Sequence, residues 1–276
     1  DVGYCYSDGT VYGNQTAVLV ILMCKTVLKF MVPVLILRCC FRMPRRVAYH
    51  WKLDSPREFP AAIAVTLIVF AVANVWLLSP VNFLSSSTLG EAYYTVSYMR
   101  RSYQIVYLVF EVLAISICKE LLLHGDMLHV LRQFGDWDAV ILTAVVAVCL
   151  SHSCTTILME LTFSLVSGVA VLRSGSVVPA IFCRLLYHVM LFGLFAMEIW
   201  QSSFWQSYCL LFLFLVLIAG ILLCLLSIRP TRKNPALLTQ KHYLTLRERL
   251  YTVMHVGPLS IVLILCVILM VIEVIF

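Results

Sequence analysis

The chain has 276 residues, of which 62% are hydrophobic and 12% are charged. A soluble globular chain is about half apolar and about a quarter charged, so this composition excludes a water-soluble fold. The formal net charge of +6 does not indicate nucleic acid, because the basic residues concentrate in two loops, as in many membrane proteins. We therefore expect one polytopic membrane domain that contacts lipids and binds no nucleic acid.

Apolar runs of about 20 residues without strict alternation indicate transmembrane helices rather than barrel strands. The expected fold is therefore all-α, with about eight transmembrane helices. We divide the chain into an N-terminal region with two helices (1–102), a core (103–200) and a C-terminal region with two helices (201–276). The expected helices cover 16–37, 60–78, 103–131, two short stretches within 139–172, 177–198, 207–228 and 256–276.

Positive charge sets the expected orientation. The loops 38–59 and 229–253 each carry six Lys or Arg residues, whereas the loop 80–102 carries only Arg100 and Arg101. Because cytoplasmic loops are enriched in Lys and Arg, we expect the N-terminus outside and both basic loops in the cytoplasm. The chain has no initiating methionine, which is compatible with a processed or truncated piece.

Lys25 and Lys29 are four residues apart in the first expected helix and so share one face. We expect them to extend towards the interface or to pair with a buried carboxylate such as Glu111. A basic stripe that faces a substrate is the alternative interpretation.

Three stretches place ionisable side chains inside apolar runs. Such groups are costly in hydrocarbon and usually face a bundle interior or a wet cavity. At a rise of about 1.5 Å per residue, Glu120, His152 and His188 are expected at a similar depth, roughly 17–20 Å from the inner end of their helices. A carboxylate and two imidazoles at one depth can activate a water and stabilise an oxyanion. The three stretches are Lys119–Gly125, Leu150–His152 and Arg184–His188.

The apolar run 139–172 is too long for a single span, and its clearest polar interruption is 151–156. We expect a turn within the membrane there, between two short helices. Such a turn is tolerated only where protein or a water-filled cavity covers it, so His152 is expected at the edge of a cavity.

The residues alone leave other interpretations open. A histidine in an apolar helix is more often an interhelical hydrogen-bonding contact than a catalyst. His124, Asp126 and His129 could ligate a metal, but their spacing is not a recognised zinc motif. A solvated helix end explains them better, and we predict no metal and no cofactor. A transporter would favour inverted repeats and paired broken helices, which we do not find.

The stretch 119–192 resembles the CAAX-protease and bacteriocin-processing (CPBP, ABI-type) family of intramembrane endopeptidases. The family motifs are Glu-Glu-x-x-x-Arg, usually followed by Gly, then Phe-x-x-x-His and His-x-x-x-Asn. The resemblance implies a CAAX-protease-like core in the third to sixth helices, with metal-independent chemistry. The similar segments are Lys119-Glu120 through His124-Gly125, Phe134-Gly135-Asp136-Trp137 with the run that ends in His152, and Phe163 through Pro179 to His188.

Several motif positions differ from the family pattern. Lys119 stands in place of the first, catalytic glutamate, and Phe192 stands in place of the asparagine. His124 and Val148 replace the motif arginine and phenylalanine. The resemblance implies that the catalytic residues are Glu120, His152 and His188. The substrate-binding or supporting residues that it implies are Lys119, His124, Arg184 and Phe192.

Two functions follow from this pattern. The first is intramembrane hydrolysis of a membrane-associated or lipidated protein, with a membrane-anchored or prenylated peptide as substrate and Glu120 as the base. In the second, catalysis is lost and the protein acts in membrane binding, immunity or assembly. A lysine protonated at neutral pH cannot accept a proton, and losing an oxyanion donor at Phe192 costs on the order of a hundredfold in rate. The orientation of Lys119 and Glu120 towards the two histidines distinguishes these functions.

Overall fold

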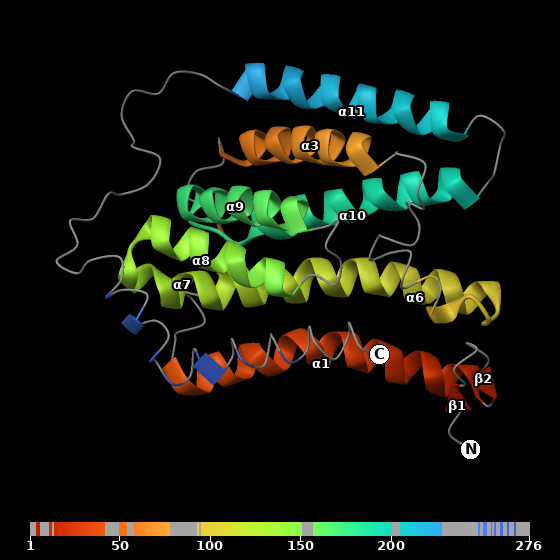
Figure 1. The fold of residues 1–276 in the computed structure, drawn as a ribbon, viewed down its shortest axis with the longest axis horizontal. Coiled ribbons are helices and arrows are strands. Elements are labelled where there is room, and N and C mark those ends of the chain that lie inside the picture. The colour runs from red at the N-terminus through yellow and green to blue at the C-terminus, as the bar shows by residue number, and fades with distance from the viewer. Residues whose placement is uncertain are drawn as a thin grey trace.

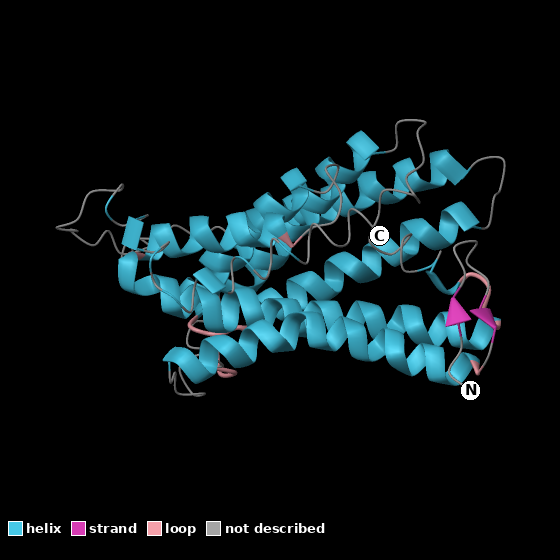
Figure 2. Ribbon diagram, turned by 60° about the horizontal axis from the view of Figure 1, so that its bottom comes forward, coloured by secondary structure: helices cyan, strands magenta, loops and turns pink. Residues whose placement is uncertain are grey.

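The computed structural model of the chain is a bundle of long helices that run side by side (Figure 1). It describes residues 4–5, 11–12, 14–41, 50–53, 58–77, 93, 95–150, 157–199 and 205–227, together with scattered positions between 248 and 268. Within this part of the chain, the strands are β1 (Tyr4–Cys5) and β2 (Val11–Tyr12), a short antiparallel pair that the sequence did not predict (Figure 2). The predicted all-helical class is otherwise confirmed.

The helices follow the ranges expected from the apolar runs up to residue 227. The expected turn at 151–156 and most of the expected helix 256–276 lie outside the described residues. The helical segments are α1 (Gln15–Phe41), α3 (Glu58–Leu77), α6 (Arg101–Ala114), η1 (Ile115–Lys119), η2 (Leu121–Met127), α7 (Leu128–Leu131), η3 (Arg132–Phe134), α8 (Asp136–Cys149), α9 (Ile157–Ser174), α10 (Val178–Ile199) and α11 (Trp205–Ser227).

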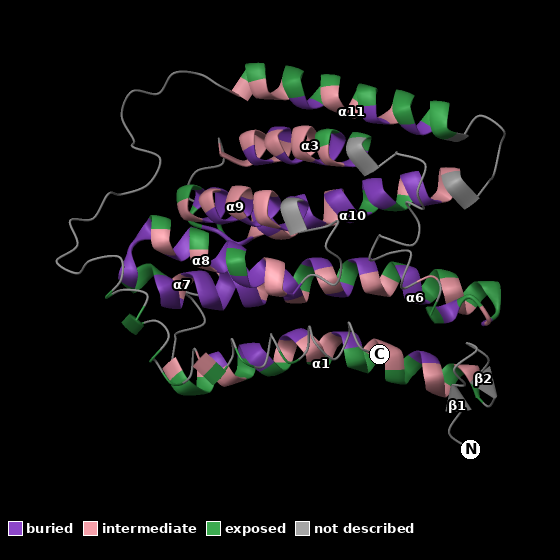
Figure 3. Ribbon diagram, viewed as in Figure 1, coloured by how far each residue is buried: buried purple, intermediate pink, exposed green. Residues whose placement is uncertain are grey.

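The surface of the bundle is suited to lipid. Buried residues gather on α7 to α10, whereas α11 exposes much of its length (Figure 3). Most exposed side chains of α11 are apolar; Leu225 and Leu226, for example, are 68% and 75% exposed. In the described part of the chain, four helices are long and apolar enough to cross a membrane: Gln15–Phe41, Glu58–Val75, Val178–Met197 and Gln206–Ser227. The chain is therefore a multi-pass membrane protein, as predicted.

The expected helix 103–131 is continuous but not regular. Its backbone is π-helical over Ile115–Lys119 and again over Leu121–Met127, before α7 returns to α-helical geometry. A π turn bonds residue i to i+5, is rare, and is frequent at functional sites. These two segments cover the Lys119–Gly125 stretch, so its side chains do not follow the spacing of a regular α-helix.

Glycines with positive φ form two turns at one end of the bundle. Gly135 (φ 125°) precedes α8, and Gly175 (φ 69°) lies between α9 and α10. Such backbone conformations favour glycine because it lacks a Cβ atom. The second turn also binds the loop before α3, since His50 Nδ1 lies 2.8 Å from the Gly175 carbonyl oxygen and Ser176 Oγ donates to the His50 carbonyl at 2.7 Å.

Gly220 allows α11 to pack closely on α3. A Cβ atom at this position would lie 2.9 Å from Ile68 Cγ1, 3.1 Å from Ile68 N and 3.1 Å from Leu67 Cβ. Small residues commonly permit this close approach between membrane helices.

We expect Gly220→Ala to destabilise the α3–α11 contact, because the added methyl group meets the backbone of Ile68, which cannot move easily. Overpacking of this kind costs about 1–3 kcal/mol. The matched control is Gly193→Ala on α10, where an added Cβ has no neighbour within 4 Å. Thermal unfolding in detergent micelles should show a lower midpoint for the Gly220 variant alone. Equal midpoints would contradict the close contact.

Candidate functional site

Arg184 lies at the centre of a buried ion-pair network. Its side chain is 1% exposed, and its Nε donates to Glu120 Oε1 at 2.7 Å. Its Nη1 donates to both carboxylate oxygens of Glu160, at 2.8 and 2.9 Å. The guanidinium also lies over the Phe163 ring, 4.2 Å from the centroid. One cation of α10 therefore joins carboxylates from the α6–α7 run and from α9.

Lys119 and Glu120 bind different partners in this network. Lys119 Nζ lies 3.0 Å from Glu160 Oε2, whereas Glu120 binds Arg184. The network thus contains two cations and two carboxylates, which balance in charge. Buried ions need such pairing, because desolvation of an unpaired charge costs several kcal/mol.

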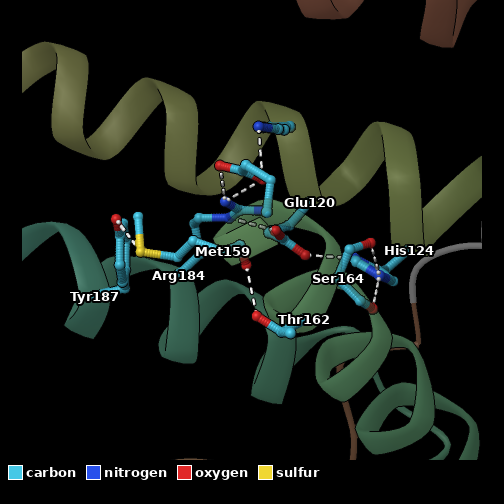
Figure 4. Close-up of polar contacts among 9 residues, drawn as sticks. Glu120, His124, Met159, Thr162, Ser164, Arg184 and Tyr187 are labelled. Carbon is cyan, nitrogen blue, oxygen red and sulfur yellow. Dashed lines mark hydrogen bonds and ion pairs between the residues drawn. The ribbon is translucent and has the colours of Figure 1, made fainter. Parts of the chain in front are cut away.

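His124 extends the network away from Arg184 (Figure 4). Its Nδ1 lies 2.5 Å from Glu120 Oε2, and its Nε2 lies 3.1 Å from the Ser164 carbonyl oxygen and 3.3 Å from Ser164 Oγ. The order serine, histidine, glutamate has the connectivity of a hydrolase triad. All three residues are 0% exposed, however, so a substrate cannot reach the hydroxyl in this conformation. We interpret this series of hydrogen bonds, from Glu120 through His124 to Ser164, as a contact that holds η2 against α9.

His188 lies one helical turn after Arg184 on α10 and is 3% exposed. Its ring packs edge-on against the Tyr187 ring, with centroids 5.2 Å apart. Within the described residues, neither ring nitrogen of His188 has a hydrogen-bond partner. Buried polar atoms are nearly always paired, and a neutral imidazole has one donor and one acceptor nitrogen. His188 is therefore free to bind a water or a substrate group.

Residues 101–190 match the family model of type II CAAX prenyl endopeptidase Rce1-like proteins. The resemblance to the CAAX-protease family is therefore confirmed over this segment. The match runs from the start of α6 into α10, so it includes Arg184, both carboxylates of the network and His188. No curated protein and no solved structure matches the chain.

The structure brings together most of the predicted site residues in this CAAX-protease-like segment. Lys119, Glu120, His124 and Arg184 all belong to the network. His188 shares a helix with Arg184, and no hydrogen bond joins it to Glu120. His152 lies outside the described residues.

Phe192, at the position of the family asparagine, is 40% exposed. Its ring lies 6.2 Å from the ring of Phe195 on the same helix. A phenyl ring cannot donate the hydrogen bond of the asparagine that it replaces. Any oxyanion donor in this part of the site must therefore come from another residue.

Glu160 is a site residue that the sequence analysis missed. It lies inside the apolar run 139–172, whose polar stretch 151–156 was interpreted as the clearest interruption. The signal that could have identified Glu160 is its charge, since an ionisable residue in a membrane span usually faces a functional site or a paired group. Its partners could not be inferred, because they depend on how α9 packs against α10 and the α6–α7 run.

The three residues of the metal interpretation each contact other groups of the chain. His124 binds Glu120, Asp126 lies 3.2 Å from Arg38, and His129 Nδ1 lies 2.7 Å from the Gly125 carbonyl oxygen. Within the described residues, no group of three or more metal-ligating side chains occurs.

A second polar contact joins α1 to α6. Thr26 Oγ1 donates to Glu111 Oε2 at 2.8 Å. Lys25 and Lys29 belong to the same helix as Thr26, and their pairing with this carboxylate stays a prediction.

We expect Arg184→Met to destabilise the fold strongly, because it leaves two buried carboxylates without their shared cation. Breaking a buried ion pair costs about 3–5 kcal/mol. Arg184→Lys should recover only part of this loss, since a lysine cannot present the planar fork that binds both carboxylates.

The matched control for Arg184 is Arg173→Met, which breaks a more exposed pair with Glu58. Such a pair contributes about 1 kcal/mol or less. Thermal unfolding in detergent micelles measures the three variants together. A loss for Arg184→Met no larger than that for Arg173→Met would show that the network does not stabilise the bundle.

Proposed function

We propose that this chain is an intramembrane hydrolase of the CAAX-protease type that cleaves a membrane-associated or lipidated protein. The family match over residues 101–190 supports this class of reaction. The observation that carries the proposal is His188, a buried imidazole without a hydrogen-bond partner among the described residues, beside a network of charged groups. Such an unpaired polar group in a membrane core is typical of a site that binds a reacting molecule.

Peptide hydrolysis needs a base for the attacking water and a donor for the oxyanion. The network provides two carboxylates, Glu120 and Glu160, held in place by Arg184 and Lys119. His188, one helical turn after Arg184 on α10, provides a donor nitrogen. The predicted residues Glu120, His152 and His188 belong to the proposed site, in which either Glu120 or Glu160 acts as the base, with Lys119, His124, Arg184 and Phe192 as surrounding groups.

The proposal includes the organisation inferred from the sequence. It comprises about eight transmembrane helices, with the CAAX-protease-like core at 103–200 between the regions 1–102 and 201–276. The apolar outer surface supports contact with membrane lipids, from which a membrane-anchored or prenylated peptide would enter. The positive-inside pattern supports an external N-terminus with the loops 38–59 and 229–253 in the cytoplasm.

A second candidate function is binding without hydrolysis. Lys119 stands in the place of the family's first glutamate, and each oxygen of Glu120 already accepts a hydrogen bond, from Arg184 or from His124. In this case the core would hold a membrane peptide or lipidated tail for an immunity or assembly function. The network would then serve only to keep the helices together.

Purified protein in mixed lipid–detergent micelles should cleave a prenylated peptide that ends in a CAAX sequence, with the fragments identified by mass spectrometry. We expect His188→Gln to reduce the rate by about a hundredfold or more, as for loss of a catalytic group. His129→Gln is the matched control. The Nδ1 of this histidine lies 2.7 Å from the Gly125 carbonyl oxygen, one helical turn away, and the variant should leave the rate unchanged.

Peptide binding is measured in parallel by fluorescence anisotropy. Binding by the wild type without any cleavage would overturn hydrolysis and favour the second function. Cleavage that His188→Gln leaves intact would instead remove His188 from the mechanism.

Cysteines at the end of α1 test the proposed orientation. Cys39 and Cys40 are exposed, whereas Cys183 and Cys209 are buried. A membrane-impermeant maleimide should label Cys39 and Cys40 in sealed cells only after permeabilisation, because the loop that follows them is cytoplasmic. The two buried cysteines should stay unlabelled under both conditions. Labelling of Cys39 or Cys40 in sealed cells would reverse the orientation.

A further inference from the structure

The two carboxylates of the network differ in access. The Glu120 side chain is 0% exposed, whereas the Glu160 side chain is 10% exposed. A general base must be within hydrogen-bond reach of the water whose proton it takes. Glu160 is therefore the more accessible of the two carboxylates.

The carboxylates also differ in how they are bound. Glu120 accepts a hydrogen bond from Arg184 on one oxygen and from His124 on the other, so each oxygen is held by a different helix segment. Glu160 Oε1 accepts from Arg184, and Oε2 binds both Arg184 and Lys119. A carboxylate has about four lone-pair sites, so both carboxylates retain hydrogen-bonding capacity, and exposure is what separates them.

The packing of α9 on α10 brings Glu160 towards His188. The Tyr187 hydroxyl donates to Met159 Sδ at 3.2 Å, which places the residues next to Glu160 and His188 in contact. Arg184, which binds Glu160, is one turn from His188 on the same face of α10.

We infer that Glu160, and not Glu120, is the catalytic base of the proposed hydrolysis, acting with His188. The inference rests on the proposed function. It assigns Glu120 a positioning role, because Glu120 orients Arg184, which in turn holds Glu160. It also gives Lys119 a role, since its ammonium group holds the carboxylate of Glu160 in place.

The reaction step balances without a further reactant. The water oxygen bonds to the scissile carbonyl carbon, and one water proton passes to the Glu160 carboxylate. The N–H of His188 donates to the oxyanion that forms. As the tetrahedral intermediate collapses, the C–N bond breaks, and the proton on Glu160 passes to the leaving amine.

The test must separate catalysis from folding, because Glu160→Gln alone would leave Lys119 buried without its carboxylate. We therefore compare Lys119→Met with the double variant Lys119→Met/Glu160→Gln. Neither leaves Lys119 as an orphan cation, and they differ only in the carboxylate. Glu111→Gln, on α6 outside the network, controls for loss of a buried carboxylate. Cleavage of the prenylated CAAX peptide and thermal unfolding are measured for all three.

We expect Glu111→Gln to cleave the peptide at a rate within about tenfold of the wild type. Lys119→Met should be slower than the wild type, because no ammonium group then holds Glu160, and the double variant should lose at least about a further hundredfold relative to Lys119→Met. Its unfolding midpoint should stay near that of Lys119→Met, and its peptide binding should be retained. If the double variant cleaves as fast as Lys119→Met, Glu160 is not the base, although the proposed function stands. If the wild type leaves the peptide intact, the proposed function fails and the inference fails with it.

Discussion

The bundle depends on one buried guanidinium. Arg184 of α10 binds Glu120 from the α6–α7 run and Glu160 from α9, and its flat face packs on Phe163. In a membrane the apolar helices have little hydrophobic drive to associate, so packing and polar contacts decide how they meet. A lysine would reach one carboxylate, whereas the fork of arginine reaches both. This geometry fixes the relative positions of the three segments that form the site.

The charges of the site follow from that geometry. A carboxylate placed in hydrocarbon needs a cation, and two carboxylates near one guanidinium need a second cation. Lys119 supplies it at the position where the CAAX-protease family has a glutamate, and it pairs with Glu160. The local balance of two positive and two negative groups is thus kept. A motif compared position by position registers only the lysine at this position and not the carboxylate of Glu160 that the lysine binds.

The apolar runs were sufficient to predict the all-helical class and the extents of α1, α3, α10 and α11, because run length alone limits a membrane span. They also placed Glu120 and Arg184 within the bundle, since such groups are costly in lipid. Glu160 was missed because its place in the site depends on an ion pair with Lys119, which is 41 positions away (160 − 119) and on another helix. The π-helical stretches could not be predicted either, since no periodicity of apolar residues marks them.

Those π-helical stretches have a consequence for the way the run 101–131 meets its neighbours. Each π turn inserts extra backbone relative to an α-helix, so the stripes of side chains on α6 and α7 are out of phase with each other. The two ends can therefore face different partners: α6 packs against α1, and α7 packs against α8. Lys119 and Glu120 lie where the phase changes, so these neighbouring residues can bind partners on separate helices, α9 and α10. The irregular backbone thus separates two helix–helix interfaces, and the ion pairs form at the point between them.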